Sequence, residues 1–170
     1  MATASEDRAP AGVVIRPIEE SDREWLRPFM AEHWGAETMV SGGRLMRPAE
    51  FPGFVAEREG KVVGVVTYRH EGADFEVASL DSLEEGRGIG KALLGAVTDV
   101  ARAKGVPRAW LVTTNDNMRA LRFYQRLGWE LVAVHRGAVD RARETLKPEI
   151  PRVGNDGIPL RDEIELEYRL

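Results

Sequence analysis

The strongest hydrophobic pattern in the chain lies between residues 89 and 101. Apolar side chains recur there at every third or fourth position, which is the spacing of one face of an amphipathic α-helix. They are Ile89, Ala92, Leu93, Ala96, Val97, Val100 and Ala101. Gly105 follows this stretch, and a glycine there is typical of the residue just beyond a helix C-cap. The pattern predicts a helix that ends near residue 104.

A period of two residues marks the end of the chain. Apolar and polar side chains alternate from residue 163 to 170, with Ile164, Leu166 and Tyr168 on one face. This alternation predicts a strand with one face buried in a sheet. Short apolar runs predict further strands at residues 13–18, 54–57, 61–68, 75–83, 109–114 and 129–135. Glu59-Gly60 separates two of these runs and predicts a hairpin.

Other segments predict helices and loops. Ser21-Asp22 can cap a helix that runs to about residue 31. Two more helices are expected at residues 117–127 and 138–147. Residues 33–52 lack clear periodicity and contain Gly42-Gly43, so an irregular loop with short helical pieces is expected there.

Together these elements predict one α+β domain. The expected order mixes antiparallel hairpins with strand–helix–strand units, so the fold class is α+β (mixed α/β) rather than a doubly wound parallel sheet. A chain of 170 residues is within the range of one compact domain. Residues 1–12 are expected to form a disordered tail, since the chain opens with acidic residues and no apolar stretch. Residues 13–170 are expected to form the domain.

Composition excludes several kinds of chemistry. The chain has no cysteine, which excludes disulfides, thiolate metal sites and a cysteine nucleophile. Its three imidazoles, on His33, His70 and His135, are not spaced as metal ligands on one helix would be. No metal site is therefore expected.

Charge and hydropathy limit the expected partners and location. The net charge of −4 gives no reason to expect binding to nucleic acid. No apolar run reaches the roughly 18 residues that a membrane-spanning helix needs. The first residues do not resemble a signal peptide. A cytoplasmic protein without membrane contact is therefore expected.

A glycine-rich turn joins a predicted strand to the strongest predicted helix. The turn and the start of the helix comprise Gly86, Arg87, Gly88, Ile89, Gly90 and Lys91. Glycines let the backbone turn tightly and let a ligand approach its N–H groups, and a helix start adds free N–H donors at the positive end of its dipole. With the two cations, this arrangement predicts a cradle for a diphosphate. A tight turn that needs glycine for its geometry alone is the simpler alternative.

The turn does not fit two other nucleotide-binding motifs. The dinucleotide pattern G-x-G-x-x-G fails because Lys91 or Leu93 stands at the last glycine position. The P-loop pattern G-x-x-x-x-G-K-[ST] fails because Glu85 stands at its first glycine and Ala92 at its hydroxyl position. Dehydrogenase and kinase functions are therefore disfavoured.

Two segments resemble signatures of the GNAT N-acetyltransferase superfamily. Residues 85–90 resemble its coenzyme A signature, (Q/R)-x-x-G-x-(G/A), with Glu85 in place of Gln or Arg. Residues 117–129 resemble N-x-x-A-x-x-F-Y-x-x-x-G-F, with Trp129 in place of Phe. The resemblance implies a single, mostly antiparallel twisted sheet of about seven strands with helices on both faces. It also implies direct transfer of an acetyl group from acetyl-CoA to a primary amine.

The resemblance assigns roles to single residues as well. It implies that Tyr124 is the general acid that protonates the departing thiolate, with packing in its helix as the structural alternative. Glu76 is the first candidate for the general base, because a carboxylate in an apolar strand could have a raised pKa. Asp81 is the second candidate, and water the third. Asn117 is expected to bond the pantetheine arm or to cap its helix, and backbone N–H groups near Leu83 to polarise the thioester carbonyl.

The coenzyme contacts and the acceptor complete the prediction. The residues expected to contact the coenzyme are Ser82, Leu83, Gly86, Arg87, Gly88, Ile89, Gly90, Lys91 and Asn117. The acceptor pocket is expected from residues 33–48, where Trp34, Met39 and Met46 could line it, and from residues 135–159. A small-molecule amine and a peptide amine both remain open, as does a homodimer. Two other functions also remain open: a non-catalytic acyl-CoA-binding sensor and a structural or interaction domain.

Overall fold

The computed structural model of the chain describes residues 9–170. It divides into two compact units. The first holds the chain up to Glu37, Arg47–Ala109 and Leu170, and the second holds Thr38–Met46 and Trp110–Arg169. The first eight residues of the predicted tail lie outside the described residues. From Pro10 the chain turns into its first strand, with the N–H of Val13 donating to the Pro10 carbonyl at 2.9 Å.

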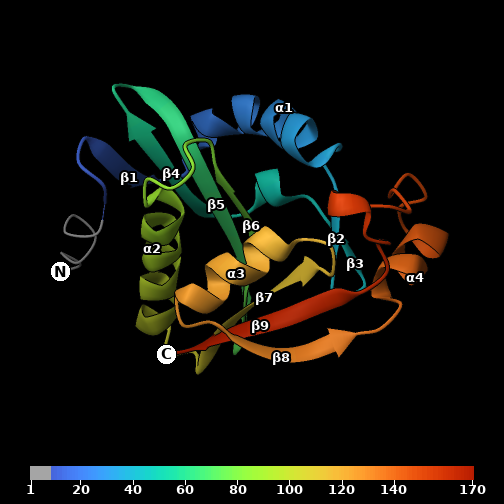
Figure 1. The fold of residues 1–170 in the computed structure, drawn as a ribbon. Helices are drawn as coiled ribbons and strands as arrows, with labels where there is room; N and C mark the ends of the chain where they lie inside the picture. Colours follow the sequence, from blue (N-terminus) through green and yellow to red (C-terminus); the bar gives the residue numbers. More distant parts are fainter. Residues whose placement is uncertain (1–8) are drawn as a thin grey trace. The chain divides into compact units, whose positions relative to one another are not determined.

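The first unit is built on four antiparallel strands and two helices (Figure 1). In sheet order the strands are β1 (Val13–Pro17), β4 (Gly53–Arg58), β5 (Lys61–Glu71) and β6 (Asp74–Ser82). The helices are α1 (Arg23–Trp34) and α2 (Ile89–Ala103), with short 3-10 helices η2 (Glu20–Asp22) and η3 (Pro48–Glu50). Glu59 and Gly60, with φ of 51° and 73°, form the predicted hairpin turn between β4 and β5.

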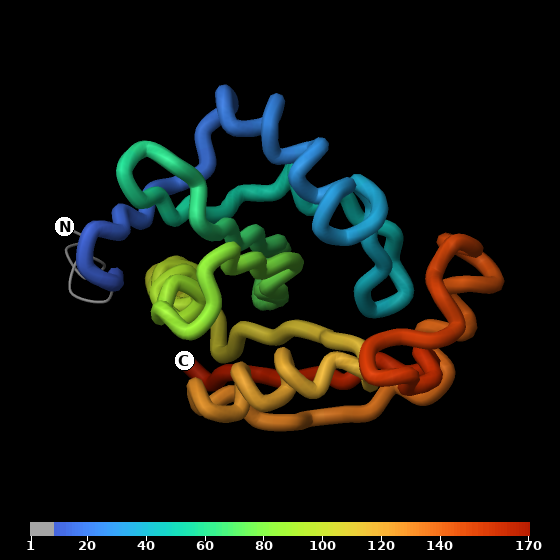
Figure 2. The backbone as a smooth tube through the Cα atoms, turned by 45° about the horizontal axis from the view of Figure 1, so that its top comes forward, coloured from blue at the N-terminus to red at the C-terminus, as the bar shows by residue number. Residues whose placement is uncertain are grey.

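The two helices cover opposite faces of these strands. On one face, Val65 packs with Leu26 and Met30 of α1 in a buried cluster. On the other face, a Cβ placed on the neighbouring Gly64 would lie 2.8 Å from Cγ2 of Ile89 in α2. Neighbouring residues of a strand point to opposite faces, so α1 and α2 lie on different sides. Figures 1 and 2 show the same arrangement around the green strands.

The apolar stripe predicted on residues 89–101 is the buried face of α2. Ile89, Leu93 and Val97 have no exposed surface. Burying each such side chain stabilises the fold by about 1.5–3 kcal/mol. The helix ends as predicted, since Lys104 is its C-cap and Gly105 follows with φ of 69°.

The second unit holds the remaining elements of residues 9–170. In sheet order its strands are β7 (Arg108–Thr114), β9 (Glu163–Arg169) and β8 (Glu130–His135), with β8 and β9 antiparallel. Its helices are α3 (Met118–Arg126), α4 (Ala138–Thr145) and the short 3-10 helix η4 (Asn155–Gly157). The large sheet thus counts seven described strands, most of them in antiparallel pairs. The predicted α+β class is confirmed.

One prediction for the second unit is wrong. Residues 38–46 are not an irregular loop, because β2 (Met39–Ser41) and β3 (Arg44–Met46) pair as a hairpin. Gly42 and Gly43 join them with φ of 55° and 75°. Two successive positive φ angles match the right-handed twist of a hairpin, and glycine adopts them without strain. The Gly-Gly pair is a hairpin signal, but strands of three residues are too short to show a period of two.

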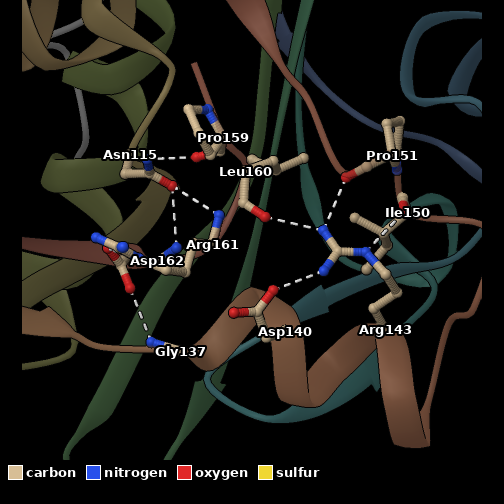
Figure 3. Close-up of polar contacts among 10 residues, drawn as sticks. All are labelled: Asn115, Gly137, Asp140, Arg143, Ile150, Pro151, Pro159, Leu160, Arg161 and Asp162. Carbon is tan, nitrogen blue, oxygen red and sulfur yellow. Dashed lines mark hydrogen bonds and ion pairs between the residues drawn. The ribbon is translucent and has the colours of Figure 1, made fainter. Parts of the chain in front are cut away.

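Arg143 of α4 holds the long connection that leads from α4 to β9 (Figure 3). Its guanidinium donates to the carbonyl oxygens of Ile150 at 2.9 Å and of Pro151 and Leu160 at 2.8 Å each. It also donates to Oδ1 of Asp140 at 2.7 Å. The side chain is buried, so these bonds replace water both for the cation and for the carbonyls.

A second set of contacts ties the same connection to the end of β7 (Figure 3). Oδ1 of Asn115 accepts from the N–H groups of Arg161 at 3.0 Å and Asp162 at 2.9 Å, and its Nδ2 donates to the Pro159 carbonyl at 2.9 Å. Asp162 in turn accepts from the N–H of Gly137 at 2.8 Å, which lowers the pKa of that carboxyl. Polar bonds, rather than an apolar core, therefore shape this part of the chain.

Replacing Arg143 tests that conclusion. Arg143→Met keeps much of the stem but leaves three carbonyl oxygens without their donor, so we expect the free energy of unfolding to fall by about 2–4 kcal/mol. Arg141→Met is the matched control, because Arg141 lies exposed on the same helix and donates to a single carbonyl, that of Arg136. Urea unfolding followed by circular dichroism measures both variants. Equal losses in the two would contradict the assignment.

Candidate active site

The turn between β6 and α2 has the backbone geometry of the predicted anion cradle. Gly86 and Gly88 have φ of 69° and 77°, which other residues adopt only with strain. Gly88 is the N-cap of α2, and no side chain caps the helix there. The N–H groups of the first helical turn have no acceptor within the helix. A Cβ on Gly86 would meet no atom within 4 Å, whereas one on Gly88 would lie 3.6 Å from Cγ of Pro10, so the turn is open at Gly86.

The charges around the turn fit a diphosphate. The side chains of Arg87 and Lys91 are exposed beside it. The Glu84 carboxylate is paired with Arg58, which compensates its charge. Glu85 is exposed. Two cations at an uncapped helix start therefore face solvent, where an anionic ligand can reach them.

Both ends of the cradle rest against Gly64 of β5. Gly64 pairs with Ser82, the last residue of β6 before the turn. A Cβ on Gly64 would lie 2.9 Å from the Asp81 carbonyl oxygen and 2.8 Å from Ile89 Cγ2 at the start of α2. Contacts this close leave no room for a side chain, so glycine at this position sets the separation of the strand and the helix.

Three of the predicted coenzyme residues are engaged by the fold itself. The N–H of Leu83 donates to the Val63 carbonyl at 2.9 Å, so it is not available to polarise a thioester carbonyl. The side chain of Ile89 is buried, which leaves its backbone to face a ligand. The hydroxyl of Ser82 donates a hydrogen bond to the Glu84 carbonyl at 3.2 Å, which stabilises the start of the turn.

Glu76 is a buried member of an ion-paired cluster. Its side chain is 1% exposed, and its Oε2 lies 3.3 Å from Nη2 and 3.4 Å from Nε of Arg69. Arg69 also binds Asp74 at 2.8 Å and Glu71 at 3.3 Å. The pairing with Arg69 neutralises much of the Glu76 charge inside the protein.

Asp81 lies near the end of β6, on the face that α1 covers. It stands directly opposite Val65, whose side chain packs against α1. Burial raises the pKa of the Asp81 carboxyl, and this rise is partly offset by a hydrogen bond from Trp34 and by the nearby His33. That bond, from the indole Nε1 of Trp34 to Asp81 Oδ2, is 2.9 Å long.

Tyr124 and Asn117 belong to the second unit. Tyr124 is 9% exposed, and its ring lies 5.2 Å from that of Phe123 and 5.8 Å from that of Trp129. Asn117 is the N-cap of α3, and its Oδ1 accepts from the N–H of Ala120 at 3.1 Å. The capping alternative for Asn117 is therefore observed, and its amide N–H₂ remains as the donor for a ligand.

The sequence missed the contact between Trp34 and Asp81. Trp34 is expected from the sequence to line an acceptor pocket, but 47 positions separate it from Asp81 and no local pattern links them. The described residues 9–170 contain no group of three or more His, Asp or Glu side chains that could hold a metal ion. None of their helices is long and apolar enough to span a membrane.

Comparison with known proteins identifies the family. The model of the acetyltransferase (GNAT) family matches residues 18–129, which is more than half of the chain. The chain belongs to the GNAT acetyltransferase family. Its sequence is 44% identical to YdhI of Bacillus subtilis over 153 residues, which are 89% of this chain and 95% of YdhI.

Solved GNAT structures share the fold. A Bacillus subtilis acetyltransferase in complex with CoA aligns with a TM-score of 0.68 and 18% identity, covering 93% of this chain and 99% of that one. A GNAT family acetyltransferase from Elizabethkingia anophelis with acetyl-CoA bound aligns with a TM-score of 0.65 and 18% identity, covering 94% and 99%. The GNAT fold predicted from the two sequence signatures is confirmed.

Proposed function

We propose that this chain is an N-acetyltransferase that moves the acetyl group of acetyl-CoA to a primary amine. The observation that carries the proposal is the cradle between β6 and α2, in a chain of the GNAT acetyltransferase family. Solved proteins of the same fold hold CoA or acetyl-CoA. The class of acceptor remains a small-molecule amine or a peptide amine.

The cradle residues would hold the coenzyme by its diphosphate. Backbone N–H groups of residues 86–91 would face the phosphate oxygens, while Arg87 and Lys91 would add charge-assisted contacts. Asn117 would donate its amide N–H to the pantetheine arm. When bound, acetyl-CoA supplies the acetyl group as a reactive thioester.

Asp81 is the better supported general base of the two carboxylates. Its raised pKa brings it closer to the range in which a base works near neutral pH. Glu76 is 1% exposed and ion-paired with Arg69 at 3.3 Å, so an incoming amine would have to reach a carboxylate that is already engaged inside the fold. Glu76, or water, stays the alternative.

The proton transfers balance with one acid and one base. Asp81 takes a proton from the acceptor ammonium, and the free amine nitrogen then forms a bond to the acetyl carbon as the C–S bond breaks. Tyr124 donates its phenol proton to the departing thiolate. The second proton of the amine leaves the new amide and restores the phenol through solvent. Holding the two reactants together supplies several kcal/mol more.

One experiment tests the function against the open alternatives. We expect acetyl-CoA to raise the melting temperature, because saturation at 100-fold its Kd stabilises by about 2.7 kcal/mol. We also expect free thiol to be released when a suitable amine from a panel is added, with no loss of activity in EDTA. Thermal stabilisation without thiol release across the panel would favour the acyl-CoA sensor, and neither effect would favour a structural domain.

Charge reversal at the two ends of α2 tests the cradle. Lys91→Glu should raise the Kd for acetyl-CoA about tenfold or more, since it replaces an attractive contact with a repulsive one. The same change should preserve or raise the melting temperature, because an acid in the first helical turn favours the helix dipole. Lys104→Glu, at the C-cap, should do the reverse, with unchanged Kd and lower stability. Calorimetric titration and thermal unfolding measure both, and wild-type affinity in Lys91→Glu would contradict the cradle.

Removing one hydroxyl tests the general acid. Tyr124→Phe keeps the ring and its packing on Trp129, so the melting temperature and the KM for acetyl-CoA should change little. Its kcat should fall by roughly 100-fold, the usual scale for loss of a general acid. Tyr168→Phe is the matched control, because that ring also lies against Trp129, at 5.7 Å, and its kcat should stay near wild type. An unaltered kcat in Tyr124→Phe would assign Tyr124 to packing.

A further inference from the structure

We propose that Trp34 is a positioning residue for the general base, and that its indole N–H orients the Asp81 carboxylate toward the amine to be acetylated. This inference rests on the proposed function, since it needs Asp81 to act as the base. It concerns residues of the first unit alone.

The hydrogen bond from Trp34 makes the two oxygens of the Asp81 carboxylate different. Oδ2 accepts from Nε1 of Trp34 at 2.9 Å. Among residues 9–170, no protein donor bonds to Oδ1. Because Oδ2 already accepts from the indole, Oδ1 is the oxygen that keeps all of its lone pairs to accept a proton from an ammonium group. Trp34 thus fixes the rotation of the carboxylate and leaves one oxygen for the acceptor.

The end of α1 explains why Trp34 reaches this carboxylate. Trp34 is the last residue of α1, and Gly35, with φ of 76°, ends the helix immediately after it. The helix lies on the Asp81 face of the strands, where Val65 packs against it. Trp34 remains 41% exposed, so it stands at the border between the half-buried Asp81 and solvent. An acceptor amine arriving from solvent would meet Asp81 beside the indole.

The groups that face Asp81 are few. From α1, His33 is the titratable group near it. From β5, the residue directly opposite is the apolar Val65. Along the chain, the neighbours two positions away are Ser79 in β6 and Leu83 just after it, which carry no charge. Burial raises the pKa of the Asp81 carboxyl, and the hydrogen bond from Trp34, followed by the nearby His33, lowers it.

The indole N–H has a measurable consequence for the pH dependence of the reaction. A base must be deprotonated to act, so kcat/KM falls on the acid side of its pKa. The N–H stabilises the charged carboxylate, and removing it raises the pKa further. The acid limb of the profile should then move to higher pH. A shift of about one pH unit corresponds to the usual strength of a hydrogen bond to a charged group.

The experiment compares three variants with the wild-type enzyme over the range from pH 5 to 9. Trp34→Phe keeps an aromatic ring but loses the donor, and it should move the acid limb upward by about one pH unit. Trp34→Gln restores an N–H donor and should return the limb toward its wild-type position. Trp25→Phe is the matched control, because Trp25 of the same helix also donates its indole N–H to an aspartate, Asp22, at 3.0 Å. Its acid limb should not move.

Two more variants separate the outcomes. Asp81→Asn should abolish the acid limb and lower kcat/KM at least 100-fold. His33→Gln removes the other titrating group, so a limb that persists in it cannot belong to the imidazole. An unmoved limb in Trp34→Phe, with activity lost in Asp81→Asn, would overturn the role of Trp34 and leave the base in place. Full activity in Asp81→Asn would overturn the choice of base, and no acetyl transfer by the wild-type enzyme would overturn the proposed function itself.

Discussion

The close approach of α2 to β5 at Gly64 is the constraint on which the candidate site depends. No side chain fits there, because a Cβ would fall within 3 Å of the Asp81 carbonyl oxygen and of both Ile89 and Leu93. The end of β6 and the beginning of α2 therefore both lie against Gly64, and so lie close to each other. The six residues 83–88 must connect these two points within a short distance, and glycines with positive φ allow them to do so. The open backbone of the cradle is thus a consequence of tight packing beneath it.

The second unit is shaped by a different force. Its long connection between α4 and β9 contains little regular structure, and its backbone carbonyls meet a buried guanidinium, that of Arg143. Asn115 and Asp116 add to this arrangement, since Oδ2 of Asp116 accepts from both the backbone and side-chain nitrogens of Asn155. Such bonds are directional, so they define one loop conformation where apolar packing would permit several.

The two candidate bases on β6, Glu76 and Asp81, show how the environment separates residues of the same charge. Glu76 is paired with Arg69, and its charge is compensated inside the fold. Asp81 has a single indole donor, and burial raises its pKa. An apolar strand position and the family resemblance suggested a base at Glu76, whereas the proposal of Asp81 rests on the different partners of the two groups. Charge compensation from the neighbouring strand is not visible in the pattern of one strand alone.

The sequence by itself determined the periodic elements, the glycine-rich turn and the family. The stripe of α2, the Glu59-Gly60 hairpin and the cap at Asn117 depend on residues a few positions apart, and short-range geometry decides them. The hairpin at residues 39–46 was missed because its strands are too short to repeat a pattern. Only the tertiary structure decided which carboxylate meets Trp34, which pairs with Arg69, and why Gly64 has no side chain. The first and last of these depend on contacts between segments 17 to 47 positions apart, and the pairing of Arg69 with Glu76 depends on the register of a hairpin, none of which the pattern of a single segment encodes.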